Sequence, residues 1–388
     1  MIENLNQPHV GMFVFAWFLA DLLVPVLIWI ALRVGAVDRP HTYKTHEHPV
    51  AFLGGVGIFL AFSVAIFSIL RFESFEGNRP LFGIVFGAAF VLVLGVIDDM
   101  RPIWAVAKLI VLFLATWLLG RFGVAATLFE QPFAWANTVL TLLWIAGVTS
   151  AMNSLDNMDG AAGGVTVLAA LTTFVIAWEN YSALPGGAEN AYWRQVQRWV
   201  SFASIAHAGA TLGFLRYNAV GPARTYLGNN GAFLTGFLLA AITILGAWSQ
   251  SDKVKSIIIP CVVLVVPLYD ITLSTILRVK SGVVKGIGEA ITYCGRDHVS
   301  HRLAALGLGK RGAVLFLYLF SAVAGCVAIY ISRPSVPRVQ YLPVTGAGIV
   351  VLVVLGVILD RAKVYESLPA PRAAGDDKGG AITDGAVV

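Results

Sequence analysis

The sequence predicts an all-α integral membrane protein, a polytopic helical bundle with about eleven transmembrane helices. Hydrophobic residues make up 57% of its 388 residues, charged residues make up only 13%, and the mean hydropathy is +0.78. A water-soluble fold could not bury so much apolar surface, and an intrinsically disordered chain requires low hydrophobicity. The apolar stretches are about 20 residues long, which fits spanning helices rather than the roughly ten-residue alternating strands of a membrane barrel.

Each span is placed where hydropathy peaks between polar stretches. We expect residues 1–361 to form one membrane-embedded domain and residues 362–388, rich in Gly, Ala, Pro and Asp, to form a disordered cytoplasmic tail. The eleven expected spans lie near residues 12–34, 50–70, 81–97, 103–120, 136–152, 162–178, 200–218, 231–248, 257–278, 312–332 and 341–359.

Charged residues predict which side of the membrane each loop occupies. The loops after the odd-numbered spans and the tail carry about 17 Lys and Arg residues, and the other side carries about 9, so the positive-inside rule makes the first side cytoplasmic. All polar and glycine-rich clusters fall on that side, which predicts an active site at the cytoplasmic membrane surface. These clusters are Asp38–Gly55, Asp98-Asp99, Asn153–Gly164, Asn218–Gly231 and Asp270–Arg302.

Other partner classes are less well supported. The cysteines Cys261, Cys294 and Cys326 form no CxxC pattern, which argues against a zinc site or a disulfide framework. No run of basic and aromatic residues predicts a nucleic-acid surface, so we expect no nucleic-acid partner. The net charge of +5 fits contact with anionic membrane lipids.

Two adjacent aspartates, Asp98 and Asp99, end an apolar span. Carboxylates at a membrane boundary cost free energy unless they are paired, solvated or bound to a cation. One interpretation is a site for Mg²⁺ or for a diphosphate held through Mg²⁺. The other is a solvated helix end with Arg101 as a surface partner.

A second acidic cluster follows the fifth span. If this segment is helical, Asn153, Asp156 and Asp159 repeat at i, i+3 and i+6 and share one face. Two carboxylates and an amide there suit a metal ion or a base acting on a phosphate nucleophile. Gly160 would permit close approach of a ligand to the backbone. The alternative interpretation is an acidic helix end.

Three further segments carry candidate anion-binding groups. In the loop after the seventh span, Arg224 could bind phosphate, although composition alone favours an ordinary tight turn. His298, His301 and Arg302 could bind a diphosphate and a leaving group, or else form a basic loop on lipid headgroups. A further set could hold an anionic lipid phosphate or carry an intramembrane charge: Lys44, His46, Lys108 and Asp270.

In order and spacing, these clusters resemble the polyprenyl-phosphate N-acetylhexosamine-1-phosphate transferase superfamily, glycosyltransferase family 4. That superfamily includes the enzyme that makes lipid I and the UDP-GlcNAc–undecaprenyl-phosphate transferases. The resemblance covers Asp38 to Arg302. It rests on Lys44, His46, Pro49 and Gly54-Gly55, on Asp98-Asp99 and Lys108, on Asn153, Asp156, Asp159 and Gly160, on Asn218, Pro222-Ala223 and Gly228, on Pro267, Asp270 and Arg278, and on His298, His301 and Arg302.

The resemblance implies transfer of a sugar 1-phosphate from a UDP-N-acetylhexosamine to a polyprenyl phosphate such as undecaprenyl phosphate, with release of UMP. It implies an inner-membrane enzyme in contact with membrane lipids, dependent on Mg²⁺ with Mn²⁺ as an alternative, and it leaves a homodimer open. The site residues it implies are Asp98, Asp99 and Asp159 as catalytic groups, Asp156, Asp159 and Asn229 as metal ligands, and Lys44, His46, Lys108, Asn153, Asn218, Arg224, His298, His301 and Arg302 as substrate-binding groups.

Three positions depart from the family pattern. Asn229 stands where the family has an aspartate that binds Mg²⁺, and an amide oxygen brings no negative charge. Ser300 replaces a third histidine, and Ala51 replaces a proline. The first departure leaves an alternative, a weak or inactive homologue that binds the lipid carrier or the nucleotide sugar. A secondary transporter is disfavoured because its ion sites would lie near the bilayer midplane.

Overall fold

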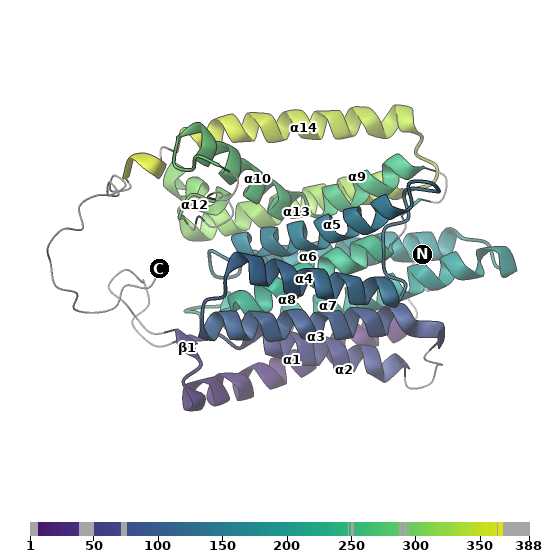
Figure 1. The fold of residues 1–388 in the computed structure, drawn as a ribbon, viewed down its shortest axis with the longest axis horizontal. Helices are drawn as coiled ribbons and strands as arrows, with labels where there is room; N and C mark the ends of the chain where they lie inside the picture. The colour runs from purple at the N-terminus through teal and green to yellow at the C-terminus, as the bar shows by residue number, and fades with distance from the viewer. Residues whose placement is uncertain are drawn as a thin grey trace, which may run out of the picture.

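The protein is a bundle of long helices that lie side by side, as the computed structural model shows (Figure 1). The structure describes residues 7–38, 50–70, 76–246, 248–249, 252–286, 289, 293, 295–362 and 364–367. Its only described strands, β1 (Val37–Asp38) and β2 (Val50–Ala51), pair as a short antiparallel ribbon at one end of the bundle. The described part of the chain is therefore all-α apart from this ribbon, as predicted.

Short turns precede or follow several of the described helices. The turns are η1 (Glu76–Asn78), η2 (Ala188–Asn190), the π turn η3 (Ala304–Leu308) and η4 (Val364–Ser367). The helices are α1 (Gln7–Val34), α2 (Gly54–Leu70), α3 (Arg79–Met100), α4 (Ala105–Arg121), α5 (Trp135–Leu155), α6 (Ala161–Ala183), α7 (Ala191–Asn218), α8 (Gly228–Leu245), α9 (Lys253–Val263), α10 (Val265–Lys280), α12 (Val299–Leu303), α13 (Gly309–Ser332) and α14 (Arg338–Asp360).

By length and apolarity, seven of the described spans can cross a membrane, and the bent pair of α9 and α10 makes an eighth. Every one of the eleven expected spans is a helix or this bent pair. Three fall outside the count: α2 and α4 have only 17 residues each, and α7, which contains polar residues such as His207 and Arg216, is not apolar enough. The chain is thus a multi-pass membrane bundle, and eleven crossings stay a prediction.

The expected ninth span is broken rather than continuous. Helices α9 and α10 meet at Leu264 with a bend of 78°. Pro267 lies three positions into α10 and has no backbone N–H, so it cannot donate to the carbonyl of Val263 four residues earlier. The missing bond coincides with the last residue of α9 and explains the break.

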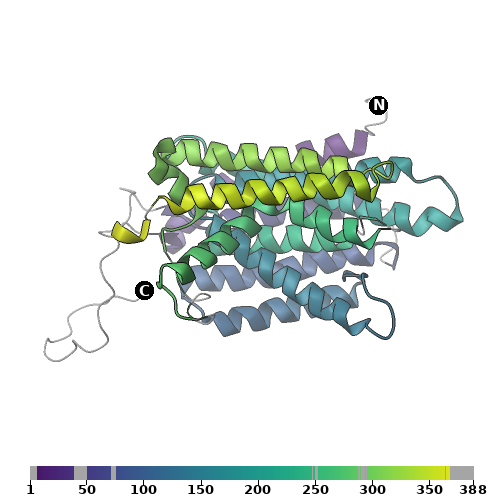
Figure 2. The same ribbon diagram turned by 90° about the horizontal axis from the view of Figure 1, so that it is seen from above.

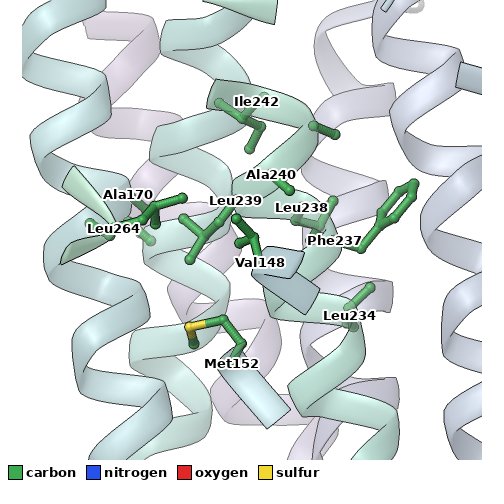
Figure 3. Close-up of a cluster of buried hydrophobic side chains, with 14 of the residues drawn as sticks. Val148, Met152, Ala170, Leu234, Phe237, Leu238, Leu239, Ala240, Ile242 and Leu264 are labelled. Carbon is green, nitrogen blue, oxygen red and sulfur yellow. The ribbon is translucent and has the colours of Figure 1, made fainter. Parts of the chain in front are cut away.

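Helix α8 lies at the centre of the bundle, with 83% of its spanning window buried. Side chains from α5, including Val148 and Met152, and Leu264 from the α9–α10 junction surround Leu238 and Leu239 of α8 (Figure 3). By contrast α14 lies at the edge, with only 11% of its window buried (Figures 1 and 2). The position of α8 matters for function because its first turn reaches the polar end of the bundle.

The polar clusters that the structure describes gather at one end of the bundle. The ribbon β1–β2, the last turns of α3 and α5, the first turn of α8 and the short helix α12 lie there, at the left of Figure 1. The shared end confirms that these loops meet. Which side of the membrane this end occupies stays a prediction.

The ordered part of the chain continues beyond the last spanning helix. Helix α14 ends at Asp360, and residues Val364–Ser367 then form η4. Of the tail that the sequence predicts to be disordered, residues 362–388, residue 362 and the turn Val364–Ser367 are described, and residues 363 and 368–388 lie outside the described residues.

At the opposite end of the bundle, Asp252 joins α9 to α14. Its carboxylate caps α9 by accepting from the N–H groups of Val254 at 3.0 Å and Lys255 at 3.4 Å. It also accepts from Arg338, at 3.0 and 3.1 Å, and from the Tyr341 hydroxyl at 2.7 Å. The Arg338 hydrogen bonds outweigh burial and, helped by Tyr341, lower the pKa of Asp252 to about 2.

We expect Asp252→Ala to lower the thermal unfolding midpoint in detergent more than Asp252→Asn. Asn keeps the capping oxygen, which is worth about 1 kcal/mol, and loses only the charge. The charge-dependent contribution is complete above about pH 4, the ordinary pKa of Asp, and is lost as the pH falls toward 2. The difference in thermal unfolding midpoint between wild type and Asp252→Asn should therefore disappear over that pH range. A difference that does not depend on pH would contradict the ion-pair explanation.

Candidate active site

The N-terminus of α8 is held by a carboxylate from α3. Asp99 accepts from the backbone N–H groups of Asn229 at 2.9 Å and Asn230 at 3.0 Å, and from the Asn230 side-chain amide at 2.6 Å. The first N–H groups of a helix have no partner inside the helix, and the helix dipole favours a negative charge there. Asp99 therefore acts as the cap of α8, supplied by a different helix.

This cap requires three helices to approach at their backbones. A Cβ at Gly95 of α3 would lie 2.3 Å from the Cα of Asn230, and a Cβ at Gly55 of α2 would lie 2.4 Å from the Cα of Gly231. Gly228 begins α8 with a φ of +68°, a conformation that favours glycine. Side chains at these glycines would push α2 and α3 away from the first turn of α8.

Three acidic residues from two segments, Asp99 of α3 and Asp156 and Asp159 of the loop after α5, meet near this turn. Asp156 follows α5 and accepts a hydrogen bond from the backbone N–H of Gly228. Burial, together with the charges of Asp99 and Asp159, raises the pKa of Asp156 to about 7. The predicted association of the two acidic clusters is thus seen in the structure, with Asp159 exposed and Asn153 half-buried in the last turn of α5.

Asn218 fixes the loop that carries the acidic residues. It is buried at the end of α7, where its Oδ1 accepts from the Gly160 N–H at 2.8 Å and its Nδ2 donates to the Thr225 carbonyl at 3.0 Å. Thr225 in turn hydrogen-bonds to Ala51 of β2 at 3.0 Å. Both functions of the Asn218 amide are therefore engaged in positioning backbone, while Arg224 on the same loop is exposed.

The paired aspartates face different neighbours. Asp98 is buried and forms an ion pair with Lys108 of α4 at 2.7 Å, and its other oxygen accepts from the Ile103 N–H at 2.8 Å. Lys108 thus has a specific partner at the membrane boundary rather than simply extending to the interface. Asp99 faces α8, so the two carboxylates stabilise different helices.

The histidine segment is anchored on α10. His298 contacts the carboxylate of Asp270 through Nδ1 at 2.8 Å and Arg278 through Nε2 at 3.3 Å. The second Asp270 oxygen accepts from the Val299 N–H at 2.7 Å. These bonds assign the His298 proton to Nδ1, because Arg278 can only donate to Nε2.

A second buried ion pair lies beside it. Arg278 donates to both oxygens of Asp297 at 2.6 and 2.7 Å, and the Tyr365 hydroxyl donates to Asp297 at 2.7 Å. Burial opposes ionisation of Asp297, but these hydrogen bonds outweigh it and lower its pKa. Arg302 is also buried and donates from Nε to the Asp297 carbonyl at 2.7 Å. Both His298 and Arg302 thus serve an internal network.

His301 is the half-buried member of this segment, and the segment adjoins the acidic loop. Ser300 donates to the side chain of Asn157 at 2.5 Å, across 143 residues of sequence. Tyr318 of α13 donates to the Gly160 carbonyl at 2.7 Å on the same loop. The serine that departs from the family pattern therefore connects the histidine segment to the acidic residues.

The structure brings together most of the predicted site residues. The predicted Lys44 and His46 lie outside the described residues. Sequence reasoning did not assign roles to Asn157, Asn230, Asp297, Tyr318 and Tyr365. Asn157, Asn230 and Asp297 lie within the polar clusters of the sequence, so their position next to predicted site residues is a signal for a role in the site. The two tyrosines belong to no pattern in the sequence.

The acidic loop and the first turn of α8 fit a hard divalent cation. Asp156 and Asp159 could supply carboxylate oxygens and Asn229 an amide oxygen. Burial is the main cause of the raised pKa of Asp156, and a cation would relieve the further contribution from the charges of Asp99 and Asp159. Among the described residues, no group of three or more His, Cys, Asp or Glu side chains is close enough to form a metal cage. Mg²⁺ requires fewer protein ligands, because phosphates and waters usually complete its coordination.

We expect Gly95→Ala to lower the thermal unfolding midpoint in detergent by the equivalent of about 1–3 kcal/mol or more, because its Cβ meets backbone atoms of α8 that cannot move alone. Gly147→Ala in α5 is the matched control, since a Cβ there has no atom within 4 Å. Alanine favours the helix by up to about 1 kcal/mol, so this control should be neutral or stabilising. Equal midpoints for the two variants would contradict the close packing of α3 on α8.

Comparison with known proteins gives a consistent family. Residues 81–247 match the model of glycosyl transferase family 4, a segment that includes Asp98, Asp99 and the acidic loop. A probable undecaprenyl-phosphate N-acetylglucosaminyl 1-phosphate transferase of Bacillus subtilis is 29% identical over 322 residues, covering 81% of this chain and 82% of the relative.

Two other relatives point the same way. A decaprenyl-phosphate N-acetylglucosaminephosphotransferase of Mycobacterium tuberculosis is 25% identical over 352 residues, covering 84% of each chain. A phospho-N-acetylmuramoyl-pentapeptide-transferase of Clostridium botulinum is 29% identical over 253 residues, covering 60% of this chain and 71% of the relative. Residues 81–247 thus resemble glycosyl transferase family 4, and the chain is similar to undecaprenyl- and decaprenyl-phosphate N-acetylglucosamine-1-phosphate transferases and to phospho-N-acetylmuramoyl-pentapeptide transferases.

Proposed function

We propose that the protein transfers an N-acetylhexosamine 1-phosphate from a UDP-sugar to a polyprenyl phosphate, in the first membrane step of a cell-envelope polysaccharide. The observation that supports this most is the convergence of Asp99, Asp156 and Asp159 with the first turn of α8. They meet at one end of a membrane bundle, where a lipid phosphate and a soluble nucleotide can also meet. The similarity to the Bacillus and Mycobacterium relatives favours N-acetylglucosamine as the sugar and a long polyprenyl phosphate as the acceptor.

The proposed reaction displaces one phosphate oxygen by another. An oxygen of the lipid phosphate forms a bond to the sugar-bearing phosphorus of the UDP-sugar. The bond from that phosphorus to the bridging oxygen breaks, and UMP leaves with this oxygen. Because both reactants are anions, catalysis depends mainly on alignment and on neutralisation of charge.

The acidic residues have different parts in this proposal. Asp159 is exposed and can take a proton from the lipid phosphate, whereas Asp99 holds the first turn of α8 in place. Asp156, Asp159 and Asn229 would hold Mg²⁺, or Mn²⁺, which when bound screens the charge of the diphosphate. Asp98 orients Lys108, whose charge lies at the same end of the bundle.

Basic and amide groups would bind the substrates. His301 and Arg224, both with exposed surface, would contact the diphosphate, and Asn153 borders the acidic loop. His298, Arg302 and Asn218 act through the backbone they position. The positive-inside bias supports placing this end of the bundle in the cytoplasm, with the chain in the inner membrane.

A weak or inactive homologue is the second candidate. Asn229 favours it, because a neutral amide replaces the negative charge expected of a Mg²⁺ ligand. Such a protein would still bind the nucleotide sugar or the lipid carrier through the remaining residues. Retention of the acidic loop and the histidine segment favours the enzyme.

The test is release of UMP by the purified full-length protein in detergent, with undecaprenyl phosphate, Mg²⁺ and a panel of UDP-sugars. We expect release that requires both the lipid and Mg²⁺. Asp159→Asn should reduce it by about 10²-fold or more if this carboxylate accepts a proton. Glu189→Gln, a substitution of the same kind on an exposed residue at the far end of the bundle, should leave it unchanged.

Asn229→Asp separates the two candidates. A working enzyme should keep or gain activity and bind Mg²⁺ more tightly, because the new carboxylate adds a charged ligand. If wild type binds a UDP-sugar but releases no UMP, and only Asn229→Asp releases it, the protein is a binding homologue. No release from either folded protein with any UDP-sugar would reject the transferase proposal.

A further inference from the structure

The chain returns to the polar end of the bundle after its last spanning helix. In η4, the Tyr365 hydroxyl donates to Oδ2 of Asp297 at 2.7 Å. The Tyr365 ring lies 4.9 Å from the guanidinium carbon of Arg302. Asp297 and Arg302 lie on either side of His298 and His301, so one tyrosine contacts both ends of the histidine segment.

The Asp297 carboxylate needs several hydrogen-bond donors because it is buried, with only 1% of its surface exposed. Arg278 supplies two of its hydrogen bonds, and Tyr365 supplies the third. A buried carboxylate oxygen that loses a donor keeps its desolvation cost without compensation. Removal of the Tyr365 hydroxyl should therefore loosen Asp297 and the residues that follow it.

Helix α14 fixes where Tyr365 can lie. Near its end, Asp360 pairs with Lys280 of α10, and the Leu359 carbonyl accepts from Arg302 at 3.4 Å. Two turns earlier along α14, the Leu352 carbonyl accepts from Tyr269 of α10 at 2.8 Å. These contacts hold the end of α14 against α10, and η4 follows four residues later at Val364.

The histidine segment has little ability to hold its own shape. Helix α12 has only five residues, too few to be stable alone. The π turn η3 follows it, with Gly307 and Gly309 at φ of +105° and +64°. One side of the segment is held by Asp270 and by Asn157, through Val299 and Ser300. The contacts of Tyr365 close the other side.

We propose that Tyr365 is a positioning residue, and that the turn after α14 holds the histidine segment so that His301 faces the nucleotide diphosphate. Tyr365 itself does not touch the substrate in this proposal. Binding of the diphosphate by His301 is taken from the function proposed above, on which this inference rests. The C-terminal segment is thus part of the substrate-binding machinery rather than a free tail at this point.

The test compares Tyr365→Phe, which removes only the hydroxyl, with Tyr365→Ala, which also removes the ring over Arg302. We expect KM for the UDP-sugar to rise about fivefold in the first and about tenfold or more in the second, with kcat within about twofold of wild type. Loss of folded enzyme alone would lower kcat and leave KM unchanged. Tyr192→Phe, on an exposed tyrosine at the far end of the bundle, is the control.

A second measurement does not depend on activity. Arg296 is exposed immediately before Asp297, so trypsin cleavage after Arg296 reports opening of the segment. We expect cleavage of the full-length protein in detergent to be about tenfold faster in Tyr365→Ala than in wild type or in Tyr192→Phe. Faster cleavage of Tyr365→Ala would be expected even if the protein released no UMP. The cleavage assay therefore distinguishes failure of the positioning role of Tyr365 from failure of the proposed transferase function.

Two results would overturn the inference. The first is a Tyr365→Phe variant and a Tyr365→Ala variant that both keep the wild-type KM and the wild-type rate of cleavage after Arg296. The second is a fall in kcat at unchanged KM, accompanied by a lower thermal midpoint, since this would assign Tyr365 to overall stability alone.

Discussion

The contact between the Asp99 carboxylate and the first turn of α8 is the constraint on which the site depends. A helix N-terminus with unpaired N–H groups cannot remain buried between other helices, and Asp99 supplies the acceptors. The contact is short enough only because Gly95 and Gly55 let α3 and α2 approach the backbone at Asn230 and Gly231. Gly228 then donates to Asp156, which extends the same arrangement to the acidic loop.

The bilayer explains why charge is organised as it is. Buried charged groups near the spanning helices have partners in the described part of the chain: Lys108 pairs with Asp98, Arg278 pairs with Asp297, and the Asp270 carboxylate accepts from His298. A buried ion pair is costly unless further hydrogen bonds satisfy it, and Tyr365 and the Val299 N–H fulfil that requirement. The acidic residues near Asp156 lie at the polar end, where charge can be concentrated for anionic substrates and a cation.

The sequence predicted the helical segments and the clusters that meet, for different reasons. Helices follow from apolar stretches of spanning length, which need no tertiary information. The shared end of the clusters follows from counting crossings, since antiparallel helices return alternate loops to one side. The ninth span was predicted as one helix, although Pro267 in the sequence indicates the break. The function of each side chain was less predictable, because burial of His298, Arg302 and Asn218 depends on residues far away in the chain.

The sequence by itself thus determined a multi-pass helical membrane protein, the order of its polar clusters and the chemistry that those residue types can perform. The tertiary structure decided which aspartate caps α8, which one pairs with Lys108, and that Ser300 contacts Asn157 and Tyr365 contacts Asp297. The physical reason is that hydropathy and residue type are local properties. The partner of a buried polar group is instead set by whichever helices pack beside it, and sequence separation does not limit that choice.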